Sequence, residues 1–291
     1  MRFQLLFLPV FFVLFVFNVS AQEHQKKLRF AFMTDIHLNA RNDGDRLNGL
    51  KQALQKVKES DVDFIVLGGD QLDISGMGYT LDKKQVDSLY TVLKKTLDEN
   101  NQTYYPTIGN HDRHFDAQNG FSEGDEVFKR YFKESYYTFE DKGIRFFILN
   151  SVQPGGESGG YVGEKQMNWL KEQLKAVSPE TPIVVSTHVP VYSIYYPVVE
   201  GKYVFMDVIA NYKELLKAFE GHHLNLVLQG HQHLYEEIFS QDVQYITGGA
   251  VCAGWWGGAF HGTEEGFLLV EVDQDNQFTW KYIDYGWTPR P

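Results

Sequence analysis

The sequence is poor in several features that define other classes of protein. Its 291 residues include one cysteine, Cys252, so an internal disulfide is impossible and a metal site built on several thiolates is excluded. Lys and Arg number 27 against 38 Asp and Glu, and no Lys/Arg-rich run is present. The net charge of −11 argues against nucleic acid or anionic lipid as a partner.

Long apolar runs are also missing after the first 21 residues. Those residues have a basic start, an almost wholly apolar stretch over residues 5–19, and the small-residue ending Val19-Ser20-Ala21, which is the pattern of a secretory signal peptide. We therefore expect cleavage after Ala21 and a single domain over residues 22–291. The protein is then secreted or periplasmic, with no stable membrane span after processing.

The alternative is that residues 1–21 are retained as an anchor. The apolar stretch is short for a bilayer span, however, and it contains Pro9 and Asn18. Cleavage would remove Arg2 and no acidic residue, so 26 basic residues would remain against 38 acidic ones, a charge of −12.

Five apolar runs with strand character each end in Asp, Asn or His. Short runs rich in β-branched and aromatic residues are typical of buried strands. In an open α/β sheet, ligands bind where the parallel strands end, so these polar side chains are expected at one edge. The runs are 29–34 before Asp35 and His37, 64–69 before Asp70, 104–108 before Gly109-Asn110-His111-Asp112, 183–187 before His188, and 226–230 before His231 and His233.

The remaining chain predicts helices between and after these strands. Apolar residues recur at helical spacing over residues 43–59, which predicts a right-handed β-α-β unit with Asp35 and Asp70 at the same sheet edge. Further helices are predicted over residues 81–97, capped by Thr80, and over residues 125–132, 164–177 and 207–219. A hairpin is predicted over residues 136–149, and strands over residues 243–246, 267–272 and 278–283.

Seven side chains at the strand ends are candidate metal ligands. Each alone has an ordinary explanation, since Asp and Asn make turns and a single His more often satisfies a core hydrogen bond. Their recurrence at five strand ends favours metal binding, and mixed imidazole, carboxylate and amide ligands suit Mn, Fe or Zn. The candidates are Asp35, His37, Asp70, Asn110, His188, His231 and His233.

Seven ligands are too many for one tetrahedral zinc ion but suit two ions that share a bridging carboxylate. Such a pair clamps the oxygens of a phosphate and lowers the pKa of bound water from ~15.7 toward ~7, so that hydroxide attacks at neutral pH.

The blocks Asp35-x-His37, Gly69-Asp70, Gly109-Asn110-His111-Asp112, His188-x-Pro190 and Gly230-His231-x-His233 together resemble the calcineurin-like metallophosphoesterase superfamily. The resemblance implies an α/β fold in which a two-sheet β-sandwich is flanked by helices. It also implies that Asp35, His37 and His233 hold one metal, that Asn110, His188 and His231 hold the other, and that Asp70 bridges them. By the same resemblance, His111 contacts the phosphate and helps the leaving group, and Asp112 orients its ring.

One residue differs from the pattern of a subgroup of this superfamily. In purple acid phosphatases a tyrosine ligand lies three positions after the Gly-Asp aspartate, and here that position is Asp73. The blocks are more similar to the bacterial cyclic-nucleotide-phosphodiesterase-like branch, which slightly favours a phosphodiester substrate. The alternatives are a phosphomonoesterase of the same fold, an exported nuclease, and a non-catalytic metal- or phosphate-binding protein. The acidic charge argues against the nuclease, and the intact ligand set with His111 and Asp112 argues against loss of catalysis.

Aromatic residues outside these blocks are candidates for a substrate wall. Tyr192, Tyr195 and Tyr196 follow the His188 block, and Trp255 and Trp256 lie in the glycine-rich stretch 248–258. Flat aromatic faces suit an organic group, and the expected substrate is a small phosphate ester. The alternative for the two tryptophans is that they simply pack against the sheet.

Overall fold

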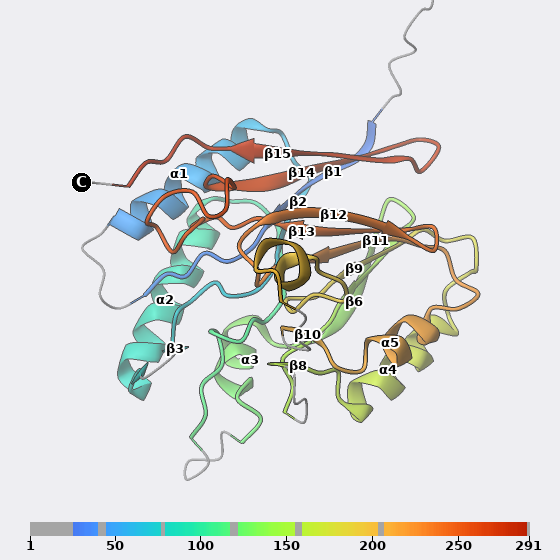
Figure 1. Ribbon diagram of the computed structural model, residues 1–291, viewed down its shortest axis with the longest axis horizontal. Coiled ribbons are helices and arrows are strands. Elements are labelled where there is room, and N and C mark those ends of the chain that lie inside the picture. The colour runs from blue at the N-terminus through green and yellow to red at the C-terminus, as the bar shows by residue number, and fades with distance from the viewer. Residues whose placement is uncertain are drawn as a thin grey trace, which may run out of the picture.

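Two stacked β-sheets form the centre of the protein in the computed structural model, which describes residues 26–39, 45–76, 79–116, 122–154, 159–202 and 207–289. Figure 1 shows their arrangement. The first sheet has the order β15 (Phe278–Asp284), β14 (Gly266–Asp273), β1 (Lys26–Met33), β2 (Phe64–Leu67) and β5 (Tyr104–Pro106). The second has the order β12 (Tyr235–Ser240), β13 (Val243–Gly248), β11 (Leu224–Gln229), β9 (Ile183–Ser186), β7 (Ile144–Ile148) and β6 (Tyr137–Asp141).

Aromatic side chains fill the space between the sheets. Phe30 and Phe64 of the first sheet stack with ring centroids 5.3 Å apart, and Phe146 of the second sheet meets both rings edge-on. Successive residues of a strand point to opposite faces, so Phe30 belongs to this inner core while its neighbour Ala31 belongs to an outer one. The predicted two-sheet sandwich is confirmed.

Helices cover the outer faces of the sandwich. They are α1 (Asp45–Glu59), α2 (Lys83–Glu99), α3 (Glu126–Phe132), α4 (Glu164–Leu174) and α5 (Tyr212–Ala218). In Figure 1, α1 and α2 lie together on the left and α4 and α5 at the lower right. Their apolar faces join the outward-facing strand residues in the outer core. The predicted cap of α2 at Thr80 is wrong, because Asp82 and Gln85 form a capping box two residues later.

Several short elements were not predicted. Strand β12 contains adjacent glutamates, which weaken the apolar pattern, yet it pairs antiparallel with β13. The predicted helix over residues 207–219 begins instead with β10 (Val208–Ile209), which pairs with β8 (Gly159–Gly160), so that α5 starts later. The expected aromatic loop contains a π-helical turn, η2 (Tyr195–Val199), and a small pair joins β3 (Ser75–Gly76) to β4 (Tyr79–Thr80).

Parallel pairing directs the strand ends to one side. In the first sheet β1, β2 and β5 are parallel, and in the second β7, β9, β11 and β13 are parallel. The backbone N–H of Asp35 donates to Gly69 O at 2.9 Å, and that of His37 donates to Asp70 O at 2.9 Å. The prediction that Asp35 and Asp70 share a sheet edge is therefore confirmed.

The predicted signal peptide, residues 1–21, lies outside the described residues. Within the described ranges, none of the helices has the length and apolar character needed to cross a bilayer.

Candidate metal centre

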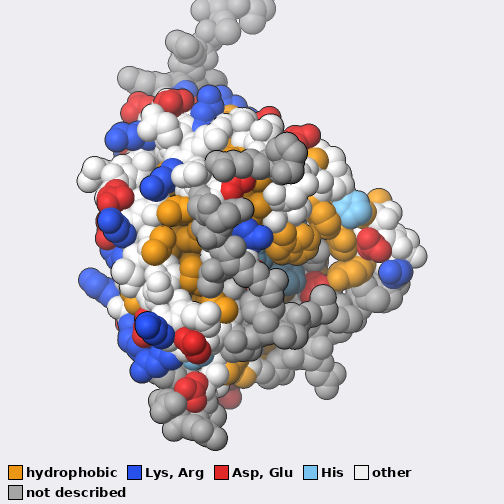
Figure 2. All heavy atoms as spheres, turned by 90° about the vertical axis from the view of Figure 1, so that its left-hand side faces the viewer, with side chains coloured by type: hydrophobic (Ala, Val, Ile, Leu, Met, Phe, Trp, Pro, Cys, Tyr) orange, Lys and Arg blue, Asp and Glu red, His pale blue; other side chains and the backbone are white. Residues whose placement is uncertain are grey.

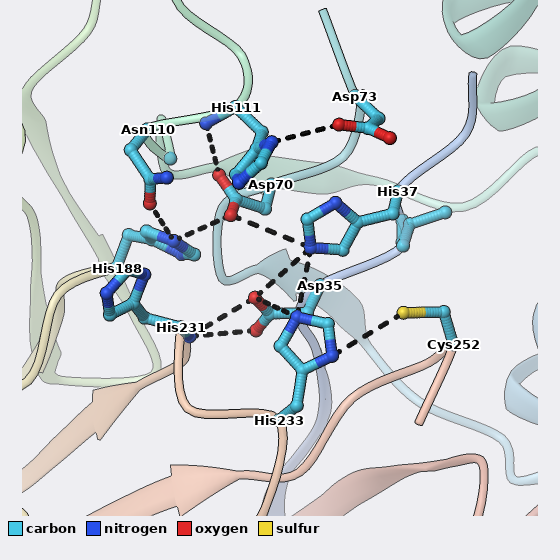
Figure 3. Close-up of polar contacts among 12 residues, drawn as sticks. Asp35, His37, Asp70, Asp73, Asn110, His111, His188, His231, His233 and Cys252 are labelled. Carbon is cyan, nitrogen blue, oxygen red and sulfur yellow. Dashed lines mark hydrogen bonds and ion pairs between the residues drawn. The ribbon is translucent and has the colours of Figure 1, made fainter. Parts of the chain in front are cut away.

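The loops after five strands bring the candidate ligands together. Asp35 and His37 follow β1, Asp70 follows β2, Asn110 follows β5, His188 follows β9, and His231 and His233 follow β11. Figure 3 shows that these side chains, with His111, point toward a common centre at Asp70 and Asp35. Both sheets thus contribute to one site, and all seven predicted ligands lie in it.

One group of donor atoms surrounds the space between His37 and His233. Their Nε2 atoms are 3.0 Å apart, and His233 Nε2 lies 3.4 Å from Asp35 Oδ1. His37 Nε2 lies 3.8 Å from that oxygen and 3.7 Å from Asp70 Oδ2. Atoms about 2.0–2.1 Å from one tetrahedral ion are separated by about 3.3 Å. The four donors therefore have the spacing that one ion requires.

A second group lies on the other side of Asp70. His188 Nε2 is 3.1 Å from Asp70 Oδ2 and 3.0 Å from Asn110 Oδ1. His231 joins this group, since donor atoms of Asp70, His188 and His231 lie within 4.8 Å of one another. Asp70 Oδ2 is thus near both groups, as a bridging carboxylate must be.

Backbone carbonyls orient two of the ligand rings. His233 Nδ1 donates to Ala253 O at 2.6 Å, and His188 Nδ1 donates to Gly68 O at 3.0 Å. A ring that donates through Nδ1 presents the lone pair of Nε2, and Nε2 is the atom that faces the other ligands in both residues. These contacts orient Nε2 of each ring toward the other candidate ligands.

Five of the ligand residues have strained backbones. Asp35, His37, Asp70, His231 and His233 have φ between 49° and 74°, the left-handed region that non-glycine residues seldom adopt. Strain of this kind persists only where surrounding contacts enforce it, and it clusters at functional sites. Here the parallel strands and the hydrogen bonds between the loops after β1 and β2 enforce it.

The glycines of two sequence blocks are required by close approach. A Cβ at Gly109 would lie 2.1 Å from Asp70 Oδ1, and one at Gly230 would lie 2.1 Å from Thr34 Oγ1 and 2.6 Å from Asp35 Oδ2. A side chain at either position would therefore displace a carboxylate of the site.

Charge is concentrated around Asp70. Burial alone would raise the pKa of this carboxyl, but nearby His188 and His111 outweigh burial and hold that pKa well below its usual range. Burial would likewise lower the pKa of His188, yet Asp70 raises it to about 9. The Asp70 carboxylate therefore favours protonation of the neighbouring histidine, and for the same electrostatic reason it favours a bound cation. His233 differs, because burial lowers its pKa to about 4 and its ring is neutral at pH 7.

His111 is the most exposed histidine of the site. Its side chain is 23% exposed, whereas that of His188 is fully buried. His111 Nδ1 lies 2.9 Å from Asp73 Oδ1, and the backbone N–H of His111 donates to Asp70 Oδ1 at 2.8 Å. Burial opposes protonation of this ring, but Asp70 and then Asp73 raise its pKa to about 9.

The expected role of Asp112 is wrong. Its carboxylate does not orient the His111 ring but accepts from the backbone N–H groups of Leu72 at 2.8 Å and Gly109 at 2.9 Å. Asp112 is fully buried and braces the loops after β2 and β5 against each other. Asp73 orients the ring instead, because it follows Asp70 on the same loop and faces His111.

Asp207 is a residue of the site that the sequence did not indicate. Its Oδ1 lies 3.3 Å from His231 Nε2, and its Oδ2 accepts a hydrogen bond from the hydroxyl of Tyr196. Gln232 Nε2 donates to its backbone carbonyl at 3.2 Å. Asp207 does not belong to any of the five sequence blocks, so no motif in the sequence pointed to it.

The two adjacent tryptophans have different surroundings. Trp255 is 48% exposed and stacks on His233, with ring centroids 4.1 Å apart and an interplanar angle of 25°. Trp256 is buried, and its Nε1 donates to Ile36 O at 2.8 Å. Trp256 is therefore a packing residue and not part of a substrate wall, which corrects the expectation for that residue.

The three candidate tyrosines likewise have different surroundings. Tyr195 and Tyr196 meet edge-on with centroids 5.0 Å apart on the π-helical turn, and the contact of Tyr196 with Asp207 places this pair beside His231. Tyr192 packs against Tyr212 and Tyr245 in the outer core. Figure 2 shows the side of the molecule that is on the left in Figure 1. Histidine side chains lie there within a hollow, with hydrophobic side chains next to it.

Comparisons with known proteins agree with this geometry. A family model described as calcineurin-like phosphoesterase matches residues 28–235. The structure is similar to that of a dimetal phosphatase from Danio rerio, with 15% identity, a TM-score of 0.64, and coverage of 89% of this chain and 96% of that one. It is also similar to GAP50, the anchor in the inner membrane complex of Plasmodium, with 19% identity, a TM-score of 0.57, and coverage of 89% and 84%. A search of curated protein sequences gave no significant match.

Proposed function

Because this chain belongs to the calcineurin-like phosphoesterase family, and is thus a metal-dependent phosphoric ester hydrolase, we propose that it hydrolyses a small organic phosphate ester at Asp70. The observation that carries the proposal is the convergence of donor atoms from five strand ends on this carboxylate. His188 Nε2 lies 3.1 Å and His37 Nε2 3.7 Å from the same oxygen, Asp70 Oδ2.

The two groups of donors define two metal positions. Asp35, His37 and His233 would hold one ion, Asn110, His188 and His231 would hold the other, and Asp70 would serve both. The donors are imidazole nitrogens, carboxylate oxygens and one amide oxygen, a set that suits Mn, Fe or Zn. When bound, the two ions supply Lewis acidity toward the phosphoryl oxygens and an activated water nucleophile.

His111 supplies the proton for the leaving group. Asp73 holds the ring through Nδ1, which leaves Nε2 as the nitrogen available to the substrate. Among the histidines of the site, His111 has the most exposed side chain, 23% against 18% for His231, and this exposure supports contact with a ligand. A proton donated from His111 to the departing oxygen would complete the cleavage of the P–O bond.

The substrate is a small ester, with a slight preference for a diester over a monoester. The net charge of −11 disfavours a long polyanion. The diester preference rests on the similarity of the sequence blocks to the cyclic-nucleotide branch and on Asp73, which stands where purple acid phosphatases have a tyrosine ligand.

Metal analysis combined with a panel of esters tests this function. The purified protein should contain about two ions per chain, and turnover of matched aryl phosphate diesters should exceed that of the monoesters. A strong monoester preference contradicts the diester assignment, and rapid cleavage of long nucleic acid contradicts the small substrate. Bound ions without turnover of any ester would instead support a non-catalytic binding protein.

Export is the remaining part of the proposal. The apolar stretch over residues 5–19 and the ending Val19-Ser20-Ala21 support cleavage by signal peptidase. N-terminal sequencing of protein from the extracytoplasmic fraction should give Gln22. Recovery of Met1 in that fraction would show that the segment is retained.

A further inference from the structure

We propose that Trp255, with Phe260 and Tyr195, forms a binding site for a flat aromatic group of the phosphate ester. The inference rests on the proposed phosphoesterase function and specifies the class of its substrate. These three rings are called the aromatic surface below. Phe260 had no role in the sequence prediction, and Trp256 does not belong to the surface because it is buried.

The first observation is the way Trp255 is held. Ala253, Trp255 and Trp256 have φ of 41°, 53° and 68°, so three non-glycine residues within four positions adopt the left-handed region. Trp256 anchors this turn, because its Nε1 donates to Ile36 O and its ring packs against Trp287 with centroids 5.0 Å apart. Packing of the buried ring thus stabilises a strained turn that leaves the neighbouring ring exposed.

The second observation is the position of that exposed ring. One face of Trp255 lies on the ring of His233, and 48% of the residue remains exposed. His233 is a ligand of the proposed metal centre, and its Nδ1 donates to Ala253 O in the same turn. A group stacked on Trp255 would therefore lie beside a residue of the proposed metal centre.

The third observation is that the aromatic surface continues beyond Trp255 and stays close to the candidate ligands, since the ring of Phe260 lies 6.2 Å from that of His233. Phe260 meets Trp255 edge-on at 5.6 Å, and the ring of Tyr195 is nearly parallel to that of Phe260 at 6.3 Å and 16°. The backbone bonds between Phe260 and Thr263 hold one end, and Glu236 holds the other by accepting from the N–H of Ile194. The surface is therefore positioned before any ligand arrives.

This arrangement selects the ligand by shape. Planar rings gain from stacking on exposed aromatic faces, whereas a short alkyl group gains little. The acidic net charge disfavours a polymer that would supply many such rings. The favoured substrate is therefore a monomeric ester that carries an aryl ring or a nucleobase.

Calorimetry with phosphonates, which are not hydrolysed, tests the site on manganese-loaded protein. Phenylphosphonate should bind about 10-fold or more tightly than methylphosphonate. Trp255→Ala should bring this ratio close to unity while the metal content and the affinity for methylphosphonate stay unchanged. Trp255→Phe should keep part of the ratio, and Phe239→Ala, which removes an exposed ring near the far end of β12, should keep all of it.

Each outcome decides the matter. The aromatic site is overturned if the wild type gains affinity from the ring neither for phenylphosphonate over methylphosphonate nor for the adenosine analogue over the ribose analogue described below, or if Trp255→Ala leaves the gain unchanged. Either result leaves the phosphoesterase function standing. Failure of the protein to bind either phosphonate would overturn that function and the inference with it. A second pair, the phosphonate analogues of adenosine 5′-monophosphate and ribose 5-phosphate, separates the sources of the ring. A gain for this pair alone identifies a nucleoside ester, and a gain for phenylphosphonate identifies an aryl ester.

Discussion

The metal ligands and the aromatic surface lie on the same face of the protein but are built in different ways. The ligands are mostly buried residues at strand ends, where both sheets restrain them. The rings of the aromatic surface are partly exposed and come from connecting segments, the π-helical turn and the chain between β13 and β14. In our proposal the first region carries the chemistry common to phosphate esters, and the second discriminates between them. Substitutions should therefore separate catalysis from substrate choice.

Removal of the bridging carboxylate should have the largest effect. Asp70→Ala takes away a carboxylate oxygen that lies 3.7 Å from His37 Nε2 and 3.1 Å from His188 Nε2, so the metal content should fall at both positions and turnover should fall to background. Elemental analysis and steady-state rates measure this. Asp70→Asn is the matched control, because it keeps the size of the side chain and removes only its charge. An Asp70→Ala protein that retained about two ions per chain would exclude a bridging role.

His111 should separate metal binding from chemistry. His111→Ala is expected to keep both ions and to lose turnover by about 10²–10⁴-fold, the usual contribution of a positioned proton donor. Asp73→Asn should cause a smaller loss, because it weakens only the contact that orients the ring. Near-normal turnover of His111→Ala with both ions bound would remove this residue from the mechanism.

The two tryptophans should differ in stability. Trp256→Ala removes a buried ring and its hydrogen bond, so the free energy of unfolding should fall by about 3–5 kcal/mol. Trp255→Ala removes a half-exposed ring, and its loss should stay below about 1 kcal/mol. Urea unfolding of both variants in a chelator compares them without a contribution from bound metal. Equal losses would show that both rings are structural.

Asp207 should have the smallest of these effects, confined to one metal position. Its carboxylate contacts His231, and loss of such an outer contact typically costs 10–100-fold in metal affinity. Titration of metal-free Asp207→Asn with manganese should show one weakened site and one unchanged site. Tyr196→Phe, which removes only the hydroxyl that donates to Asp207, should weaken the same site less. Equal weakening of both sites would mean that Asp207 acts through the fold and not through His231.

The ligand residues were predictable because each follows a strand that is visible in the sequence. An apolar run marks a buried strand, and parallel strands end on one side, so Asp35, Asp70 and His188 had to lie near one another once the runs were recognised. The roles beside them were less predictable. Asp112 is adjacent to His111 in sequence but faces the backbone, and Asp73 is distant in sequence but reaches the ring.

The order of residues determined the strands and the place of the seven candidate ligands at their ends, because hydrophobic periodicity and strand length are local properties of the chain. The two-sheet sandwich was expected from the family resemblance. Tertiary structure alone decided that Trp255 covers His233 while Trp256 is buried, and that Asp207 meets His231. These contacts join residues more than 20 positions apart through loops with left-handed backbones, and packing of the sheets and loops enforces such conformations against local preference. For this reason the chemistry and two rings of the proposed surface, Trp255 and Tyr195, could be inferred from the sequence, whereas the part of Phe260 and the burial of Trp256 became visible only in the folded chain.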